Sequence, residues 1–392
     1  MSNHDSLSRD ISLLEPEIIA LRREFHRCPE LGFEEKHTQA KVADFLGGLG
    51  LKARTGIAKT GIIADLEGER PGKTLLIRAD MDGLPVQEQS TSEYASKNPG
   101  VMHACGHDAH MSAALFAAKL LCQRRNEFAG RIRFLFQPAE ELAGGAHQMV
   151  QEGVLENVDM ALGAHVFTPY AHGTIATRVG NFFAGIDAFE LNIIGKAGHG
   201  GMPQAAVDPI VAAAHVITAL QTIVSRETKP GDPVVVSVTS ISGGIAANVV
   251  VERVTLRGAL RWHSEANRER ALGRLRSISE GICEALRAQC ELRITSTAPV
   301  TMNAEKPVEW IRQAAQKTGR ASVIDPGPLT VAEDISEFLN RVPGCLFTVG
   351  AGGQGAPPHH HHAFDIDERA VGLTAEIFVR AALEALSLDA PR

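Results

Sequence analysis

The sequence predicts a two-domain α/β protein in which a smaller α+β domain is inserted into a larger α/β domain. Strand and helix patterns alternate through the first part of the chain, which is typical of an α/β sheet. Near Ala184 the sequence pattern changes to strands with alternating apolar and polar residues and to long amphipathic helices. Cys, His, Asp and Glu residues gather where the predicted strands of the larger domain end. The length of 392 residues also favours two domains over one.

The larger domain begins with a series of patterns that end in polar residues. We predict helices at 15–27, with Pro16 in the first turn, at 37–49, at 110–128 and ending at Gln151, and strands at 61–66, 73–79, 131–136 and 158–164. The run KTLLIRA is continuous enough for a buried strand. Three of these strands lead into Asp80 and Asp82, into Glu140 and Glu141, and into His165. Ligand sites of α/β proteins lie at such strand ends.

The inserted segment has the order strand–helix–strand–strand–helix–strand, which is the split βαβ, ferredoxin-like pattern. Its predicted elements are strands at 188–194, 234–241, 249–262 and 291–296 and helices at 206–226 and 265–289, with a glycine-rich loop around His199. The returning chain supplies helices at 306–319, up to Arg341 and at 367–388, a strand at 345–350 and four histidines at 359–362. We therefore predict a larger domain of residues 1–183 and 298–392 and an inserted domain of residues 184–297.

Composition excludes several classes of partner. Hydrophobic residues make up 44% of the chain and charged residues 22%, which is ordinary for a globular protein. A net charge of −7 without a Lys/Arg block argues against nucleic acid. No apolar run reaches the about 20 residues of a membrane span, and the N-terminus lacks the apolar region of a secretory signal. Six scattered cysteines suit reduced thiols, so we expect a cytoplasmic protein.

The stretch VMHACGHDAHM, residues 101–111, is the centre of the predicted chemistry. Its polar side chains are His103, Cys105, His107, Asp108 and His110. Thiolate and imidazole are ligands of first-row transition metals rather than of Mg²⁺ or Ca²⁺. Taken alone, a histidine at a strand end is more often structural, and two adjacent glutamates often lie in a solvated loop. Here Cys105 and His107, Glu140 and Glu141, His165 and the histidines 359–362 all fall at one predicted sheet edge. Together these residues predict a hydrolytic metal site with two ions or a spare base.

Several motifs follow one another along the chain: RADMDGLP (78–85), HACGHDAH (103–110), QPAEE (137–141), GAHV (163–166), GKAGHGGMPQAAVDPI (195–210), GGIAANVV (243–250) and FDIDE (364–368). Together they resemble the hippurate hydrolase and indole-acetyl-amino-acid hydrolase subfamily of the aminoacylase/carboxypeptidase-G-type metallopeptidase family. The resemblance implies a mixed-sheet, di-metal, aminopeptidase-like catalytic domain. It also implies that the inserted domain is a lid through which the chain forms a homodimer or homotetramer.

The resemblance implies a role for each matched residue. The implied metal ligands are Cys105, His107, Glu141, His165 and His360, the last because it stands four residues before Phe364. Glu140 matches the general base, His199 a lid histidine that polarises the scissile carbonyl, and Asn248 a substrate-binding position. Asp80 or Asp82 matches a residue that orients a ligand, and His103, Asp108 and His110 become structural. The chain departs from the family at His362, where proline is common.

The implied function is metal-dependent hydrolysis of the amide bond of N-acyl amino acids, which releases a carboxylate and a free amino acid. Two divalent ions per chain are expected, Zn²⁺ or Mn²⁺, with Co²⁺ or Ni²⁺ also compatible with the ligands. A dipeptidase or carboxypeptidase of the same family is the alternative. A non-catalytic metal-binding protein and a structural di-zinc protein are further alternatives, but neither needs Glu140 together with His199. The acyl group is not identified by these residues.

Overall fold

The computed structural model describes residues 3–388, so the ends of the predicted larger domain, 1–2 and 389–392, lie outside the described residues. The chain divides into two compact units. The larger unit comprises Met1–Phe182, Thr301–Gly327 and Asp334–Arg392, and the smaller comprises Phe183–Val300 and Pro328–Glu333. Within residues 3–388, no helix is both long enough and apolar enough to cross a membrane.

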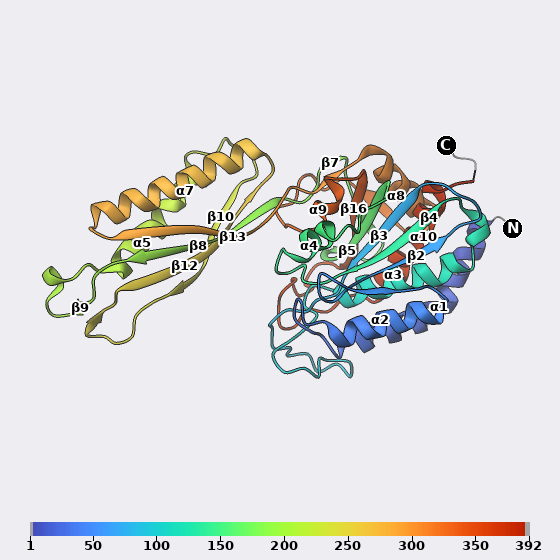
Figure 1. The fold of residues 1–392 in the computed structure, drawn as a ribbon, viewed down its shortest axis with the longest axis horizontal. Coiled ribbons are helices and arrows are strands. Elements are labelled where there is room, and N and C mark those ends of the chain that lie inside the picture. Colours follow the sequence, from blue (N-terminus) through green and yellow to red (C-terminus); the bar gives the residue numbers. More distant parts are fainter. Residues whose placement is uncertain (1–2, 389–392) are drawn as a thin grey trace. The chain divides into compact units, whose positions relative to one another are not determined.

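The larger unit is built on an eight-stranded mixed sheet with the strand order β1-β2-β4-β3-β5-β16-β6-β15 (Figure 1). The strands are β1 (Arg54–Ile57), β2 (Gly61–Glu67), β3 (Thr74–Asp80), β4 (Arg131–Gln137), β5 (Met160–Ala171), β6 (Thr174–Ala176), β15 (Ser322–Ile324) and β16 (Gly344–Gly352). β4, β3, β5 and β16 run parallel to one another. Every residue of β3 is buried, as predicted from its continuous apolar run.

Helices cover both faces of this sheet. α1 (Asn3–His26), α3 (His107–Cys122) and α10 (Arg369–Ala385) pack together, with α2 (Lys36–Gly48) and α8 (Glu305–Lys317) beside them. Leu162 and Ala164 of β5 join the core under these helices. Between them, Gly163 points to the other face, because a Cβ there would lie 2.1 Å from Ile335 Cδ1. α4 (Gly145–Gln151) and α9 (Ser336–Leu339) pack together on that other face.

α1 is longer than the sequence predicted. It begins at Asn3 instead of near Glu15, so Pro16 lies in the helix interior and not in the first turn. Leu7 and Ile11 are buried in the same core as Ile18, which extends the apolar face of the helix by about three turns. Tertiary packing therefore outweighs the hydrogen bond that Pro16 removes.

The register of the parallel strands brings their polar ends to one level. Asp80 at the end of β3 pairs with Gln137 at the end of β4, and Arg78 pairs with Gly163 of β5. His165, two residues after Gly163, is therefore level with Asp80. The expectation that His165 ends its strand was wrong, because β5 continues to Ala171 along β16. On one side of β5, the strands β3 and β4 stop at this level, and this is why His165 faces their terminal loops.

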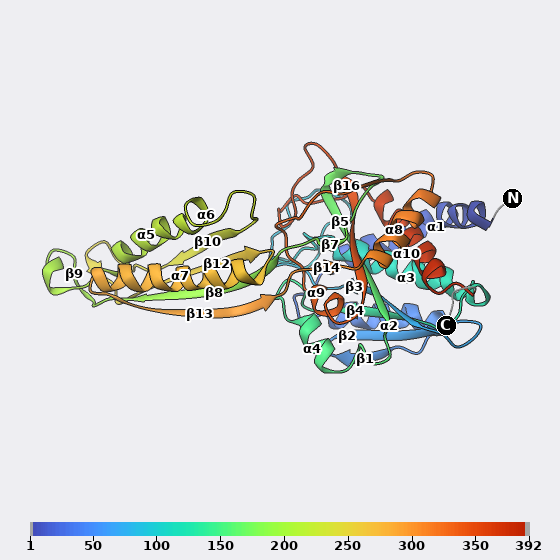
Figure 2. The same cartoon turned by 90° about the horizontal axis from the view of Figure 1, so that it is seen from above.

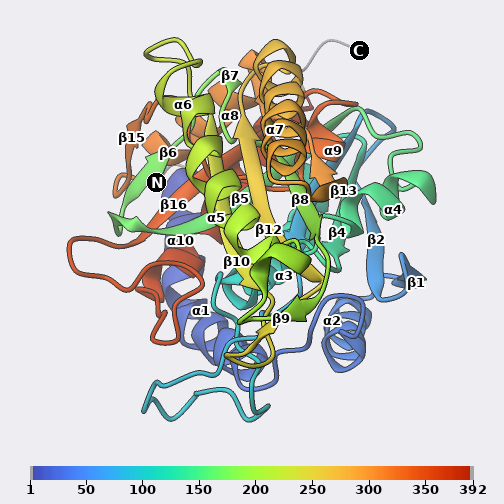
Figure 3. The same cartoon turned by 90° about the vertical axis from the view of Figure 1, so that its left-hand side faces the viewer.

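The smaller unit has a four-stranded antiparallel sheet with the order β10-β12-β8-β13. Its main elements are β8 (Gly185–Ile194), α5 (Pro209–Leu220), α6 (Thr222–Ser225), β10 (Val235–Ser242), β12 (Arg253–Trp262), α7 (Glu265–Ala285) and β13 (Gln289–Ala298). α5 and α7 lie side by side over one face of the sheet (Figures 2 and 3). This order and these crossovers are those of the ferredoxin-like fold, so the predicted fold class is confirmed.

Capping side chains fix where the two long helices of the smaller unit begin. Asp208 accepts a hydrogen bond from the backbone N–H of Ile210, and Ser264 accepts one from Asn267. The segment Pro328–Glu333 belongs to this unit through backbone bonds. The N–H of Ala184 lies 3.0 Å from the carbonyl oxygen of Leu329 and 2.8 Å from that of Val331.

A buried ion pair joins α1 to the start of α3. Arg22 Nε lies 2.7 Å from Asp108 Oδ2, and neither side chain is exposed. Arg22→Met should lower the free energy of unfolding by about 3–5 kcal/mol, because it leaves a buried carboxylate without its main counter-charge. Arg131→Met is the control, since Arg131 and Glu67 form an exposed pair that contributes at most about 1 kcal/mol. Urea denaturation of both variants measures the difference, and equal midpoints would contradict the expectation.

Candidate metal centre

The loop before α3 places two candidate ligands one residue apart. Gly106 caps α3 in the left-handed conformation, with φ of 91°, and α3 starts at His107. A Cβ at position 106 would lie 2.3 Å from Val166 Cγ2 of β5, so only glycine allows this approach. Cys105 and His107 on either side are both buried. The glycine therefore holds the thiol and the imidazole against the strand that carries His165.

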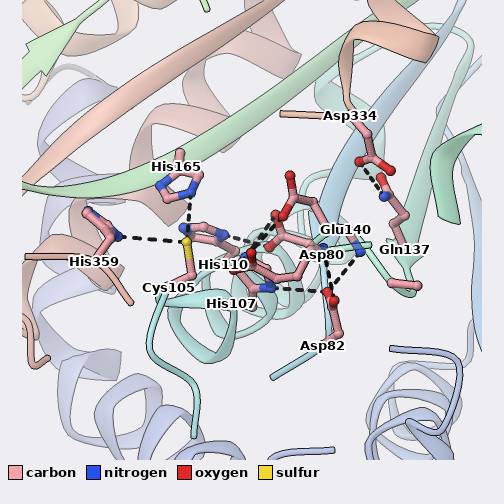
Figure 4. A network of polar contacts seen from close by, with 12 residues as sticks. Asp80, Asp82, Cys105, His107, His110, Gln137, Glu140, His165, Asp334 and His359 are labelled. Carbon is pink, nitrogen blue, oxygen red and sulfur yellow. Dashed lines mark hydrogen bonds and ion pairs between the residues drawn. The ribbon is translucent and has the colours of Figure 1, made fainter. Parts of the chain in front are cut away.

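Cys105 and His165 face each other. Cys105 Sγ lies 3.5 Å from His165 Nε2 (Figure 4). On the other side of the ring, His165 Nδ1 lies 2.6 Å from the carbonyl oxygen of Val166. Nδ1 donates its proton to that carbonyl, so the Nε2 lone pair of neutral His165 is directed at the thiol. Burial, helped by His110 and His359, holds the pKa of His165 well below its usual range. His165 is therefore neutral, which is the protonation state that ligates metals.

His107 is surrounded by carboxylates. Its Nδ1 lies 3.3 Å from Asp82 Oδ1, and its Nε2 lies 3.9 Å from both Glu140 Oε2 and Glu141 Oε1. Among the described residues, neither ring nitrogen has a partner with the geometry of a hydrogen bond. A fully buried imidazole without such a partner is unfavourable. A cation bound between His107 and the two glutamates would give the imidazole a partner.

Glu141 contacts the run of four histidines, residues 359–362. Glu141 Oε1 is 3.3 Å from His360 Nε2, and Cys105, Glu141 and His360 place one ligand atom each within 4.8 Å of one another. His359 also approaches, with its Nδ1 3.8 Å from Cys105 Sγ and its Nε2 accepting the N–H of Thr168. Two histidines of the run therefore lie at the site, and the choice of His360 as ligand stays a prediction.

These residues fit a two-ion site. One group is Cys105, His107 and His165, and a second is Cys105, Glu141 and His360. Cys105 belongs to both, so its sulfur is placed to serve two neighbouring ions. Glu140 forms a third group with His107 and Glu141. Sulfur, imidazole and carboxylate donors together favour Zn²⁺ or another first-row ion over Mg²⁺ or Ca²⁺.

Asp80 and His110 are occupied by bonds to the protein. His110 Nδ1 lies 2.6 Å from Asp80 Oδ1, and His110 Nε2 accepts the N–H of Val166. The other oxygen of Asp80 accepts a bond from Arg78 at 2.7 Å. Burial alone would raise the pKa of Asp80, but His107, His110 and Arg78 outweigh it and hold that pKa well below its usual range. Asp80 therefore stays charged, and His110 has no nitrogen left for an ion.

Asp82 links a candidate ligand to the candidate base. Its Oδ1 accepts the backbone N–H of Glu140 at 3.0 Å, and its Oδ2 accepts that of Glu141 at 3.1 Å. The same carboxylate lies beside His107 Nδ1. Of the two aspartates that the sequence left open, Asp82 is thus the one that contacts both glutamates and His107.

Sequence reasoning missed the partners of Arg78. Its guanidinium lies 3.1 Å from Asp334 Oδ1 and 2.7 Å from Gln137 Oε1, and Gln137 also donates to Asp334 at 2.6 Å. Asp334 Oδ2 accepts the N–H of Ala146 after the glutamate turn. An arginine within a strand predicted to be buried was the available signal, because buried charges are paired.

The smaller unit holds the remaining candidate residues, His199 and Asn248. β9 (Gly198–His199) pairs with β11 (Val249–Val250), and the N–H of Gly200 donates to the carbonyl of Asn248 at 2.8 Å. These bonds place the two candidates on adjacent segments. His199 Nδ1 accepts the N–H of Gly201 at 3.0 Å, so a neutral ring carries its proton on Nε2. Nε2 is therefore a hydrogen-bond donor.

Comparison with known proteins agrees with this chemistry. The model of the peptidase family M20/M25/M40 matches residues 76–384. An N-acyl-L-amino acid amidohydrolase from Geobacillus stearothermophilus is 44% identical over 290 residues, which are 74% of this chain and 78% of that protein. Thermostable carboxypeptidase 2 from Saccharolobus solfataricus is 36% identical over 378 residues, which are 95% of this chain and 96% of that protein.

A solved structure extends the likeness to the whole fold. The Bacillus subtilis YXEP protein, a dinuclear metal binding peptidase from the M20 family, matches with a TM-score of 0.80 and 33% identity. The match covers 96% of this chain and 99% of that one. The mixed sheet, the separate antiparallel sheet and the cluster around Cys105 thus occur in a chain of known family. The chain belongs to the peptidase family M20/M25/M40 and is a metal-dependent amidohydrolase/peptidase.

Proposed function

We propose that the protein hydrolyses the amide bond of N-acyl amino acids and releases a carboxylate and a free amino acid. The observation that carries the proposal is the position of Glu140, whose Oε2 lies 3.9 Å from Nε2 of the candidate ligand His107 and which belongs to neither ligand group around Cys105. The similarity to an N-acyl-L-amino acid amidohydrolase, which extends across 74% of the chain, supports the substrate class. The similarity to a carboxypeptidase keeps peptide cleavage as the second candidate.

Two divalent ions, Zn²⁺ or Mn²⁺ in our proposal, would be held by Cys105, His107, Glu141, His165 and His360, with Co²⁺ and Ni²⁺ chemically acceptable. When bound, such ions lower the pKa of a coordinated water and polarise the carbonyl of the amide. Glu140 takes a proton from the attacking water and later gives it to the departing nitrogen, so that the C–N bond breaks with a neutral amine leaving. Asp82 holds the backbone of Glu140 during both transfers.

His199 and Asn248 complete the proposal. The bond from the Gly201 N–H to His199 Nδ1 leaves the proton of a neutral ring on Nε2. This Nε2–H group can donate a hydrogen bond to the oxygen that becomes negative when water adds to the carbonyl. Asn248, directly before the adjacent strand, would bind the polar end of the substrate. Both residues are exposed, so a substrate can reach them.

His199→Ala should lower kcat by about 10²-fold, the low end for loss of an oxyanion donor, while leaving the metal content unchanged. Steady-state kinetics with elemental analysis of the same samples measure both quantities. A variant that keeps the wild-type kcat would remove His199 from the mechanism.

A substrate panel tests the function itself. Hippurate, N-acetyl amino acids, longer N-acyl and indole-acetyl amino acids, and dipeptides should be compared on apoprotein reloaded with each metal. We expect N-acyl amino acids to have higher kcat/KM than dipeptides. The reverse order would favour the dipeptidase or carboxypeptidase, and no chelator-sensitive hydrolysis of any amide would contradict the proposal.

We further propose that the smaller unit forms the contact of a homodimer, or of a homotetramer. β10 is an edge strand of its sheet, and its second half is exposed. Exposed apolar side chains lie in it or close to it in the sequence, among them Ile241 at 57% and Ile245 at 81% exposure. Sedimentation of the wild type and of Ile245→Asp tests the contact, and a wild type that sediments as a monomer contradicts it.

A further inference from the structure

We propose that Glu35 is a positioning residue for Glu140, and this inference rests on the proposed role of Glu140 as the base. Glu35 precedes α2 and is fully buried. Its Oε1 accepts the backbone N–H of Ala139 at 2.9 Å, and its Oε2 accepts a bond from Thr60 Oγ1 at 2.5 Å. Ala139 is the residue directly before Glu140. The carboxylate of Glu35 therefore acts on the turn from which the base projects.

That turn is strained. Ala139 has φ of +51°, in the left-handed region that residues with a Cβ rarely occupy. Three successive N–H groups of the turn point at buried carboxylates: that of Ala139 at Glu35, and those of Glu140 and Glu141 at Asp82. Glu35 and Asp82 together hold a conformation that the turn would not keep unaided.

The segment that carries Glu35 contacts both loops of the site. The N–H of Gly83, after β3, donates to the carbonyl of Glu30 at 2.7 Å. Gly32 packs on the turn after β4, where a Cβ would lie 3.0 Å from Ala139 Cα. Residues 30–35 therefore lie against the loop of Asp82 and the loop of Glu140 at once. This placement lets one segment set the distance between the two loops.

A purely structural role in α2 does not account for Glu35. The start of α2 is satisfied by Glu30, whose carboxylate accepts the N–H groups of His37 at 3.1 Å and Thr38 at 2.8 Å. Glu35 makes no side-chain capping bond to its own helix. Thr60 and Ala139, which donate to its two carboxylate oxygens, both lie outside α2.

The test compares three variants of the full-length, metal-loaded protein. Glu35→Ala should lower kcat at least ~10-fold with KM and metal content little changed, because small misplacements of a catalytic group are costly. Glu35→Gln keeps an oxygen for the Ala139 N–H and should restore kcat close to wild type. Glu152→Ala is the matched control: Glu152 accepts the N–H of Ala58, another alanine with positive φ, and not an N–H of the turn that carries Glu140.

Hydrogen exchange of the peptide containing Gln137–Glu141 gives a readout that needs no substrate. Exchange should accelerate in Glu35→Ala but stay slow in Glu35→Gln and Glu152→Ala. If Glu35→Ala does not fold, Glu35→Asp replaces it, since its shorter side chain draws the carboxylate away from Ala139.

Three results would overturn the inference: wild-type kcat in Glu35→Ala, loss of metal from it, or a Glu35→Gln variant as slow as Glu35→Ala. If the wild type hydrolyses no amide of the panel, the proposed function fails. Hydrogen exchange then still decides whether Glu35 holds the turn.

Discussion

Glu140→Gln should bind metal as the wild type does and hydrolyse amides at least ~10²-fold more slowly, the low end for loss of general acid–base catalysis. The substitution keeps the size of the side chain but removes its ability to accept a proton. The turn should survive, because Asp82 holds the backbone N–H of residue 140 and not its side chain. Turnover and elemental analysis of the purified variant measure the two effects separately.

Glu141→Gln provides the contrast for this experiment. Glu141 lies in the ligand group with Cys105 and His360, so its substitution should release metal as well as abolish activity. Loss of both metal and activity in Glu141→Gln, and loss of activity alone in Glu140→Gln, would assign metal binding to Glu141 and proton transfer to Glu140. Near-normal turnover of Glu140→Gln would refute its role as the base.

Cys105→Ser should lose bound metal and nearly all activity. Its sulfur belongs to both candidate ligand groups, so one substitution weakens two ions at once. Burial, reinforced by Glu141, raises the pKa of the Cys105 thiol well above its usual value when no ion is present. A bound cation must therefore displace the thiol proton, and metal affinity should fall as the pH is lowered.

Cys122→Ser is the control, because Cys122 ends α3, the helix that follows Cys105, and lies outside the candidate ligand groups. Metal stoichiometry by elemental analysis, taken at several pH values, distinguishes the two variants. An unchanged metal content in Cys105→Ser would count against ligation by the thiol.

The fold was predictable where local patterns decide it. The buried run that became β3 and the strand–helix order of the smaller unit are written in residues close together in the chain. The start of α1 was not predictable from local patterns, because its first three turns, roughly, are helical through burial of Leu7 and Ile11 in the core of the larger unit. The short strands β6 and β15 were missed for the same reason, since each exists only by pairing with a distant partner.

The site was predictable at the level of residue types at strand ends. Cys105, His107, Glu140 and Glu141 follow from chemistry and spacing, and the structure brings them together with His165. The carboxylates that support the site residues could not be predicted from the sequence. Glu35 and Asp334 lie far along the chain from the residues they contact, and their roles come from packing between loops that no local pattern encodes.

The segment Pro328–Glu333 complicates any attempt to separate the two units by genetic engineering. A fragment cut out in one piece, residues 183–300, would omit the chain that bonds to Ala184 through Leu329 and Val331. It would also leave the ring of His263 without the Leu329 carbonyl, which lies 3.0 Å from its Nε2. The polypeptide passes between the units four times, so transplanting the smaller unit into another protein requires two grafts.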